Sequence, residues 1–352
     1  MPTGGNPFIC RFKPDETTAA SNLNRMVFMQ SKMILGLGAI ALVAWSGASA
    51  QQTYPNKPVK VIVPYVAGGA ADITARVISQ KLSDHLGQPF VVENRPGANG
   101  GIGAEIVAKA PPDGYTLLIA ASGPIVINPV LYRKVAYDPV NDFAPVSQIT
   151  RFQYAVVVRE ASPIRSLQDL VATAKANPGT VSYGSTGIGG GGHLAGVLFE
   201  HLSGTKLIHV PYKGGAAVWS DLLGGQLTFT FEALVTAAPM MKSGKLRAFA
   251  ITGTQRSPTL PQLPPLAEMG FKGYDITQFQ GMLAPAKTDP AIVDKLYREL
   301  AKIGKLPDVM KRLGEDGGNE LIMNSPAEFA GLIKAELALY GKLIKDANIT
   351  SD

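Results

Sequence analysis

The chain has 352 residues, of which 46% are hydrophobic and 17% are charged, and its formal net charge is +6. This composition excludes an intrinsically disordered chain, because enough apolar surface is present to build a core. Single cores stop growing at about 250 to 300 residues, so the length favours two domains. The 38 Gly and 26 Pro argue against a helical bundle and favour an α/β protein with many tight loops.

The first fifty residues have the pattern of an export signal. Lys32 precedes an apolar run from Met33 to Trp45, which is shorter than the about 20 residues that a membrane-spanning helix needs. The small residues Ala48-Ser49-Ala50 follow, as at a signal-peptidase site. We expect export to the periplasm, cleavage after Ala50 and a mature chain that begins at Gln51; a retained membrane anchor is the alternative.

The residues before about position 26 fit no part of such a signal. We expect translation to start at Met26, Met29 or Met33 rather than at the first residue. The single cysteine, Cys10, lies in this early stretch and has no lipobox around it, so neither a disulfide nor a lipid anchor is expected. No stretch combines a basic stripe with aromatic residues, so nucleic acid is not an expected partner.

Strands and helices alternate along the expected mature chain. The first unit predicts strands over 59–64, 90–93 and 115–120, with helices that end before Gly87 and over 104–110. The pattern restarts with strands over 154–158, 181–185, 207–210, 227–231 and 246–251 and helices from Ser166 and over 193–202, 216–223 and 234–242. Continuous apolar strands joined by helical crossovers indicate parallel sheets with helices on their faces.

A strand over 278–283 and two longer helices complete the chain. The helices span 289–302 and the segment that opens at Ser325-Pro326-Ala327-Glu328. We place them on the first unit, which otherwise has only about 100 residues for a core. This predicts a leader over 1–50, a lobe one built from 51–151 and 276–352, a lobe two over 152–275, and a hinge where the chain crosses twice.

Two glycine-rich loops, each between a strand and a helix, are the candidate binding elements. One runs from Tyr65 to Asp72 and the other from Tyr183 to Leu194. Glycines leave backbone N–H groups uncovered, and such groups at a helix N-terminus attract anions. Two loops of this kind, one in each lobe, suggest a clamp for a small anion; the alternative is that the glycines only permit tight turns.

Other chemistries have weaker support. Gly187, Gly189 and Gly192 match G-x-G-x-x-G, but the segment 207–212 has no acidic residue to bind a ribose, so no nucleotide cofactor is expected. The four histidines have no metal-binding spacing. We expect His193 to form hydrogen bonds within its loop and His209 to be a core residue whose hydrogen bonds are satisfied.

Three charged residues near the loops admit two interpretations each. Asp72 is interpreted as a helix cap in preference to a residue that orients the Gly68-Gly69 loop. Lys213 is either a counter-charge for the ligand or a solvated side chain. Glu232 ends a strand that faces the expected cleft, where it would repel an anion unless a cation pairs with it, so it can discriminate between ligands.

Eight blocks of sequence, in this order, resemble the Bug receptors, the periplasmic solute-binding components of tripartite tricarboxylate transporters. The blocks are Gly68–Asp72, Val92–Ala98, Pro112–Leu117, Asn128–Tyr132, Tyr183–Gly187, His209–Gly214, Asp221–Gln226 and Gly244–Ala248, and the resemblance covers essentially all of 54–350. It implies a two-lobed periplasmic-binding-protein fold of type II that closes on a small carboxylate. Loop amides, hydroxyls and ordered water would hold the ligand without an arginine, and two separate membrane proteins would receive it.

The chain departs from the usual pattern of the Bug receptors where hydroxyl groups are common. Gly190, Ala70, Ala71 and Pro124 replace frequent Ser or Thr, and Phe279 replaces a frequent Trp. These changes predict a less polar pocket and a ligand with one carboxylate and an apolar or aromatic body.

We therefore predict a monomeric, non-enzymatic receptor with no cofactor and no metal. The predicted ligand contacts come from both loops and from two further positions: Tyr65, Gly68, Gly69, Ala71, Asp72, Ser122, Ser185, Thr186, Gly187, Gly190, His193 and Glu232. The alternatives are an exported α/β hydrolase that uses Ser185 with His193 as its base, although no nucleophile elbow surrounds Ser185, and a sensory co-receptor for a membrane signalling protein.

Overall fold

The structure is a computed structural model that describes residues 54–258, 260–346 and 349. The expected leader run, the cleavage site after Ala50, Cys10 and the candidate start residues lie outside these described residues. None of the helices in the described ranges combines the length and the apolar character needed to cross a bilayer.

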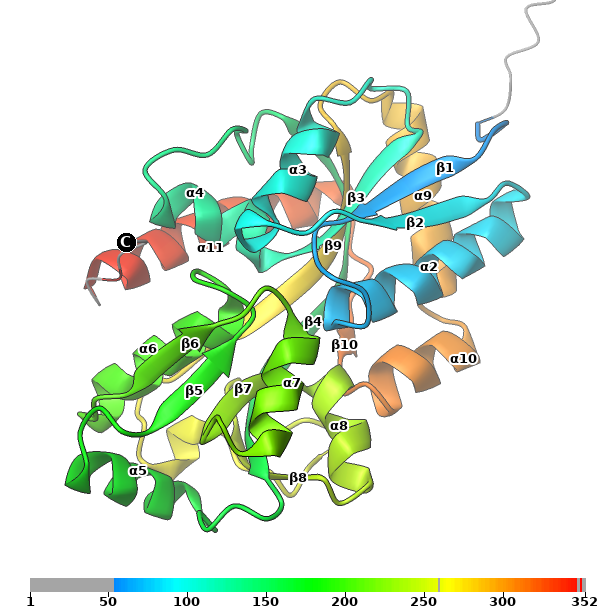
Figure 1. Ribbon diagram of the computed structural model, residues 1–352. Helices are drawn as coiled ribbons and strands as arrows, with labels where there is room; N and C mark the ends of the chain where they lie inside the picture. Colours follow the sequence, from blue (N-terminus) through cyan, green and yellow to red (C-terminus); the bar gives the residue numbers. More distant parts are fainter. Residues whose placement is uncertain (1–53, 259, 347–348, 350–352) are drawn as a thin grey trace, which may run out of the picture. The chain divides into compact units, whose positions relative to one another are not determined.

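The first group of strands forms a mixed sheet in lobe one (Figure 1). Its order is β2 (Phe90–Asn94), β1 (Val59–Val63), β3 (Thr116–Ala121), β9 (Thr277–Pro285) and β4 (Phe143–Arg159). β1 is parallel to β2 and β3, whereas β9 is antiparallel to both β3 and β4. Its main helices are α2 (Ala70–Leu86), α3 (Gly101–Ala108), α9 (Pro290–Ile303) and α11 (Pro326–Asp346).

Lobe two repeats this arrangement. Its strands are β6 (Ile208–Pro211), β5 (Ser182–Ser185), β7 (Phe229–Ala233), β4 again and β8 (Leu246–Ile251). β5 is parallel to β6 and β7, and β4 is antiparallel to β7 and β8. Its helices are α5 (Leu167–Ala176), α6 (Gly191–Ser203), α7 (Gly215–Gly224) and α8 (Leu234–Lys242). The expected two-lobed α/β fold is confirmed.

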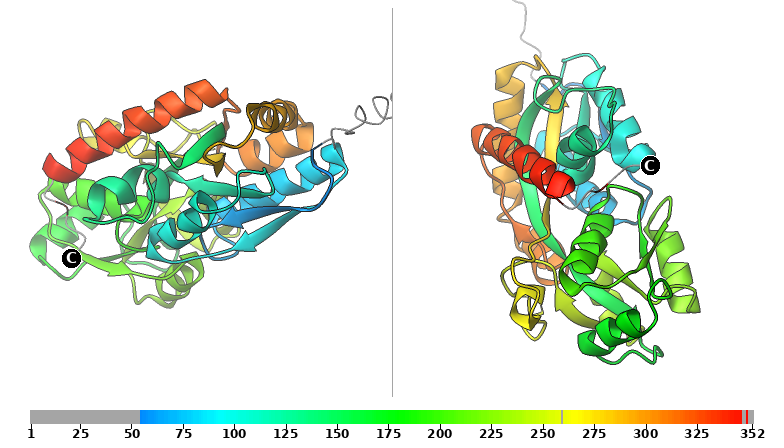
Figure 2. Two further views of the ribbon diagram at one scale, coloured as in Figure 1. Left: turned by 90° about the horizontal axis from the view of Figure 1, so that it is seen from above. Right: turned by 90° about the vertical axis from the view of Figure 1, so that its left-hand side faces the viewer.

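Short elements fill the connections. They are α4 (Asn128–Leu131), α10 (Pro307–Val309), β10 (Glu320–Leu321), the 3-10 turns Ala98–Gly100 and Leu266–Met269, and the π-turns Gly123–Ile127 and Met310–Glu315. The long helix α11 packs on β4, on α4 and on the π-turn before α4, as the two views of Figure 2 show. The C-terminal helices therefore cover the core of lobe one.

The strand β4 is much longer than the sequence predicts, with 17 residues instead of the five over 154–158. Its first half pairs with β9 as far as Gln153, and from Tyr154 onward it pairs with β7 and β8. Polar residues interrupt the apolar pattern of the first half: the Ser147 hydroxyl donates to the Asn324 carbonyl at 2.7 Å and that of Thr150 to Gln280 Oε1 at 3.0 Å. Because these buried polar side chains find hydrogen-bond partners elsewhere in the fold, the first half of β4 does not show the continuous apolar run by which a buried strand is predicted.

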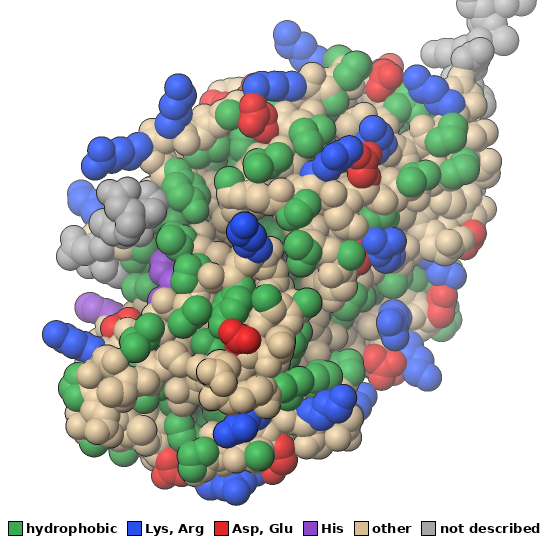
Figure 3. All heavy atoms as spheres, in the orientation of Figure 1, with side chains coloured by type: hydrophobic (Ala, Val, Ile, Leu, Met, Phe, Trp, Pro, Cys, Tyr) green, Lys and Arg blue, Asp and Glu red, His purple; other side chains and the backbone are tan. Residues whose placement is uncertain are grey.

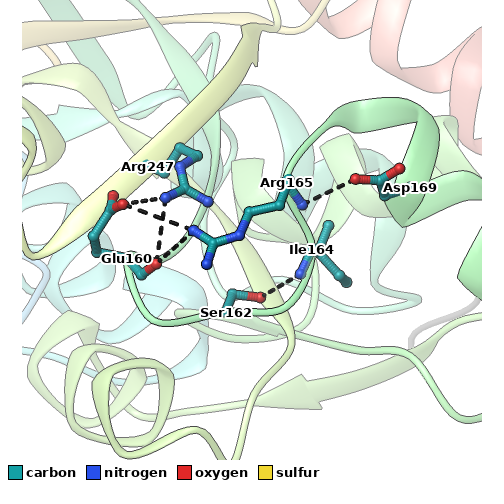
Figure 4. A network of polar contacts seen from close by, with 6 residues as sticks. All are labelled: Glu160, Ser162, Ile164, Arg165, Asp169 and Arg247. Carbon is teal, nitrogen blue, oxygen red and sulfur yellow. Dashed lines mark hydrogen bonds and ion pairs between the residues drawn. The ribbon is translucent and has the colours of Figure 1, made fainter.

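The loop that follows β4 is held by charged groups at the end of lobe two (Figure 4). Glu160 pairs with Arg247 on β8, and Arg165 Nη1 lies 4.0 Å from the Glu160 carboxylate. Ser166 then caps α5, since its hydroxyl accepts the Asp169 N–H at 3.0 Å. The predicted caps at Ser166 and at Ser325, whose hydroxyl accepts the Glu328 N–H at 3.3 Å, are both confirmed.

Candidate functional site

The first glycine loop, Tyr65–Asp72, joins β1 to α2; we call it loop one. The second, Ser185–His193, joins β5 to α6; we call it loop two. Each loop follows the carboxyl end of a parallel strand, the edge where ligands bind in open α/β sheets. The two loops therefore occupy equivalent positions in the two repeated sheets.

Asp72 holds loop one in place. Its carboxylate is 2% exposed and accepts the Gly68 N–H, Arg76 Nε and Asn94 Nδ2, each at 2.9 Å. Asn94 also donates to the Tyr65 carbonyl at 3.0 Å. The residue at the N-cap of α2 is Gly69, which has no side chain to cap the helix. Our preference for Asp72 as a cap is thus wrong: Asp72 orients the loop, and its oxygens are occupied by protein donors.

The charge of Asp72 is stabilised by the same contacts. Burial alone would raise the pKa of this carboxyl, but the hydrogen bonds from Arg76, Gly68 and Asn94 and the charge of Arg76 lower the pKa below its ordinary value. Asp72 therefore stays ionised at neutral pH and keeps its hydrogen bonds to Gly68, Arg76 and Asn94.

Loop one presents free donors on its open side. A Cβ atom at Gly68, where φ is +84°, would meet no atom within 4 Å, and at Gly69 it would meet only the Val66 carbonyl oxygen at 3.7 Å. Among the described residues we find no acceptor for the N–H groups of Gly69, Ala70 and Ala71. Since these groups lie at the N-terminus of a 17-residue helix, they form a favourable position for an anion.

Loop two differs, because most of its glycine amides are already bonded. Gly187 N–H donates to the Ser185 hydroxyl at 3.2 Å, Gly190 N–H to the Gly187 carbonyl at 3.1 Å and Gly189 N–H to His193 Nδ1 at 3.1 Å. The expectation that the glycines leave these amides uncovered is therefore wrong for Gly187 and Gly190. The expectation that His193 bonds within its loop is confirmed.

Side chains from the crossover strands cover the start of α6. A Cβ atom at Gly191 would overlap the Tyr154 hydroxyl and lie 2.6 Å from Gln278 Nε2. The Tyr154 hydroxyl donates to Gln278 Oε1 at 2.9 Å, and Gln278 is 3% exposed. Two side chains of the protein thus lie against Gly191 at the start of α6, and Thr186 is the exposed residue of loop two.

Ser185 has a histidine partner, but not the one that the sequence suggested. Its hydroxyl lies 2.7 Å from His209 Nε2, while the His193 ring packs against that of His209 at an interplanar angle of 32°, with centroids 4.2 Å apart. Burial lowers the pKa of His193 to about 4, and burial together with the neighbouring His193 lowers that of His209 to about 4. Both rings are neutral at pH 7, and Ser185 is 3% exposed, so this group holds loop two against β6.

Contacts between the lobes bring each loop to the opposite lobe. The Tyr132 hydroxyl of lobe one donates to the Ile188 carbonyl of loop two at 3.0 Å. A Cβ atom at Gly190 would lie 3.5 Å from Asn99 Oδ1, and one at Gly214 would overlap Val66 of loop one. Loop two thus touches lobe one, and loop one touches the segment between β6 and α7.

A small apolar cluster lies between loop one and the crossover strands. Its buried members are Ala121, Phe152, Ala233 and Val235, and Tyr65, Ala70, Ile73 and Tyr154 pack against it. Phe279 is not part of it: this ring is buried against Phe329, with centroids 5.2 Å apart. The idea that Phe279 shapes the pocket is therefore wrong, whereas Ala70 does add apolar surface beside loop one.

Of the remaining candidate residues, Ser122 lies in the core, whereas Glu232 and Lys213 are at least partly accessible to solvent. Ser122 is completely buried, and its hydroxyl accepts the Phe279 N–H at 3.0 Å, so it has a structural role in place of the predicted ligand contact. Glu232 is half-buried at the end of β7, and Lys213 is exposed. Sequence reasoning did not select Asn94, Asn99 or Gln278, since amide side chains far apart in the chain give no periodic signal.

The face drawn in Figure 3 has Lys and Arg side chains spread among Asp and Glu, without a patch of one sign. Within the described ranges, no group of three or more His, Cys, Asp or Glu residues is arranged to hold a metal ion.

Comparisons with known proteins agree with this architecture. The model of the "Tripartite tricarboxylate transporter family receptor" matches residues 74–349. The chain is 33% identical to the protein BugT of Bordetella pertussis over 92% of this chain and 98% of that protein.

Two solved structures are similar over nearly their whole length. A Rhodopseudomonas palustris protein determined with adipate is 36% identical, with a TM-score of 0.81 over 84% of this chain and 99% of that one. MatC from Rhodopseudomonas palustris, determined with bound malate, is 28% identical, with a TM-score of 0.78 over 83% of this chain and 100% of that one. The chain belongs to the family of tripartite tricarboxylate transporter receptors, which are periplasmic solute-binding proteins.

Proposed function

We propose that this receptor captures a small organic carboxylate at loop one, beneath the contacts that join the two lobes, and delivers it to the membrane components of a tripartite tricarboxylate transporter. The observation that carries the proposal is the set of free N–H groups at Gly69, Ala70 and Ala71 in a loop fixed by Asp72. The protein would act in the periplasm, after removal of the segment 1–50.

The proposal is supported by the electrostatics of the helix end. Unpaired N–H groups and the positive end of the dipole of α2 both favour a carboxylate there. The relatives determined with adipate and malate bind carboxylates. No Arg or Lys is needed for this mode of binding, and the ionised Asp72 is occupied by Arg76 and Asn94.

The apolar cluster beside loop one suggests the chemistry of the rest of the ligand. Ala70, Phe152, Ala233 and Val235 offer no hydrogen-bonding side chain. We therefore propose an acid with one carboxylate at loop one and an apolar or aromatic body over this cluster. A citrate molecule would leave two further carboxylates without matching donors, which costs affinity.

The test removes one backbone donor without removing a side-chain contact. Ala70 is the first residue of α2, a position that accepts proline, and Gly69 before it is extended with φ −80° and ψ 171°. Ala70→Pro deletes an N–H, while Ala70→Val adds a similar volume and keeps it. Calorimetry with benzoate, adipate, malate and citrate should show about tenfold weaker binding for the proline variant than for the valine variant.

Two results would contradict the proposal. One is equal affinity of the proline and valine variants for the acid that binds best, which would mean that the amide at position 70 does not contact the ligand. The other is tighter binding of citrate than of benzoate, which would contradict the apolar body of the ligand.

A hydrolase remains the second candidate, because Ser185 lies 2.7 Å from His209. In the described part of the chain we find no carboxylate bonded to the other ring nitrogen of His209, and the serine hydroxyl is bonded to the main chain of Gly187. The family comprises solute receptors. Incubation of ester substrates with the wild type and with Ser185→Ala tests this candidate, and only a loss of hydrolysis in the variant would support it.

A further inference from the structure

Glu232 is a half-buried carboxyl group without a cationic partner. It is the last residue but one of β7, and the Thr236 hydroxyl donates to its Oε1 at 2.6 Å. In the part of the chain that the structure describes, no Lys, Arg or His lies within ion-pair distance of it. A carboxylate that is removed from water without a cation is unfavourable in its ionised form.

Glu232 is the chain neighbour of a residue that packs with loop one. The next residue, Ala233, packs in the apolar cluster with Tyr65 and Ala70 of loop one. Tyr154, on the neighbouring strand β4, is close enough for both Glu232 and Tyr65 to raise the pKa of its hydroxyl, although burial is the largest cause. The end of β7 and two residues of loop one therefore meet at the same apolar cluster.

We propose that protonated Glu232 donates a hydrogen bond to the carboxylate held at loop one, and that ionised Glu232 repels this carboxylate. This inference rests on the proposed function and adds the residue that makes capture depend on pH. The two carboxyl groups would share one proton between them, as paired carboxyl groups at short distance do. The receptor would then bind anionic acids best in neutral or slightly acidic surroundings.

The pKa of Glu232 supports this dependence on pH. Burial raises the pKa of Glu232, and the hydrogen bonds from Thr236 and from the Ala233 N–H lower it. Burial is the larger effect, so the pKa is raised to about 7. Glu232 is therefore expected to exchange its proton near neutral pH, whereas the ligand carboxylates stay ionised there.

The titratable groups on the elements around β7 do not account for such a change. Tyr154 on β4 and Tyr183 on β5 have raised pKa values because of burial, and the pKa of His193 on α6 is lowered to about 4. On α7, Asp221 accepts the Tyr212 hydroxyl, and on α8, Lys242 pairs with Asp316 at 3.5 Å. The shifts of the two tyrosines and of His193 move their pKa values away from the range between pH 6.5 and 8.5.

A second carboxyl group with a raised pKa, that of Glu336, provides the matched control. Burial raises the pKa of Glu336 to about 7, although Arg151 and Ser122 lower it and Asp275 raises it further. Glu336 lies on α11, where Arg151, Ser122 and Asp275 are the groups that act on it. If Glu336 caused the pH dependence of binding, that dependence would persist in Glu232→Gln and be lost in Glu336→Gln. If Glu232 causes it, the dependence is lost in Glu232→Gln and persists in Glu336→Gln.

The experiment is calorimetry with adipate, malate and benzoate at pH 6.5, 7.5 and 8.5, in two buffers of different ionisation enthalpy, so that protons taken up on binding are counted. For the wild type we expect proton uptake at pH 7.5 and above, and about tenfold weaker binding from pH 7.5 to pH 8.5. Glu232→Gln, which keeps a donor at this position, should bind without proton uptake, with an affinity that does not vary with pH. Glu336→Gln should keep the slope of the wild type.

Several outcomes would overturn the inference. The first is that the wild type binds without taking up protons. The second is that the affinity of Glu232→Gln varies with pH as much as that of the wild type. The third is that the wild type binds more tightly as the pH rises, which would indicate a cationic group of the ligand beside Glu232. The first of these is measured on the wild type alone and does not depend on how the variants fold. If none of the three acids binds to any of the proteins, the proposed function itself is contradicted, and the inference with it.

Discussion

The two glycine loops occupy equivalent positions in the two lobes, yet their donors are used differently. In loop one, an aspartate holds Gly68 from one side, and three amides at the start of α2 remain free. In loop two, the amides of Gly187, Gly189 and Gly190 are bonded inside the loop, and Tyr154 and Gln278 cover the start of α6. The N–H groups of Gly191, Gly192 and His193 at the start of α6 also have no acceptor among the described residues, but here Tyr154 and Gln278 lie against Gly191.

This difference shows what a glycine does in a loop of this kind. Glycine lets the main chain turn and lets other atoms approach closely, but it does not decide where the N–H groups point. In loop two, the space left by Gly191 is filled by Tyr154, whereas the space beside Gly68 has no neighbour within 4 Å. We infer that loop one binds the ligand and that loop two mainly joins the lobes.

The largest expected effect is the loss of the anchor of loop one. Asp72→Ala leaves the Gly68 N–H and the half-buried Asn94 amide without this acceptor and removes the partner of Arg76. We expect the free energy of unfolding to fall by about 3 kcal/mol, measured by urea denaturation. Asp84→Ala, at an exposed position of the same helix, should change it by less than about 0.5 kcal/mol. A similar small effect at Asp72 would mean that loop one does not depend on this network.

Adding a methyl group should destabilise the protein more at the start of α6, after loop two, than in loop one. Gly191→Ala puts a Cβ onto the Tyr154 hydroxyl and Gln278, and overpacking of this kind costs about 1 to 3 kcal/mol. Gly69→Ala, in open space and at a negative φ, should cost less than about 0.5 kcal/mol. Thermal unfolding of the two variants measures the contrast, and equal stabilities would show that the start of α6 is not covered as described.

As the pH falls, the stabilising contribution of the histidines near loop two should be lost at a higher pH than that of Asp72 in loop one. The folded pKa values of His193 and His209 are about 4, below the ordinary value of 6.5, so the unfolded state binds more protons between pH 6.5 and 4. The free energy of unfolding should therefore fall on the order of 2 kcal/mol from pH 7 to pH 5. Asp72, whose pKa is lowered from 3.8, loses its contribution only at lower pH. His193→Gln should reduce the loss; a variant with the same pH dependence as the wild type would contradict this explanation.

The smallest effect is expected at Ser185. Ser185→Ala removes the hydrogen bonds to His209 and to Gly187 but leaves the backbone of loop two unchanged, so the free energy of unfolding should fall by about 1 kcal/mol. Binding of the best acid should change by less than about threefold, because this hydroxyl is buried. Calorimetry and urea denaturation measure both quantities, and a loss of binding greater than that at position 70 would place the ligand at loop two instead.

Most helices and strands could be predicted from the sequence, because their signals are local. Ser166 with Asp169 and Ser325 with Glu328 are capping pairs three residues apart. The strand over 246–251 and the helix over 234–242 have the predicted bounds. The first half of β4 was missed, since its polar residues find their partners 130 and 177 residues away.

The two α/β repeats, the two glycine loops and the resemblance to a carboxylate receptor can be read from the residue pattern, since each depends on residues that are neighbours in the chain. Which amides are free and which acids are buried depends on how the chain folds. Asp72 meets Asn94 across 22 residues, and Ser185 meets His209 across 24. The burial that raises the pKa of Glu232 comes from strands and helices packed around it. Burial and hydrogen-bond partners at such separations arise only when the chain has folded.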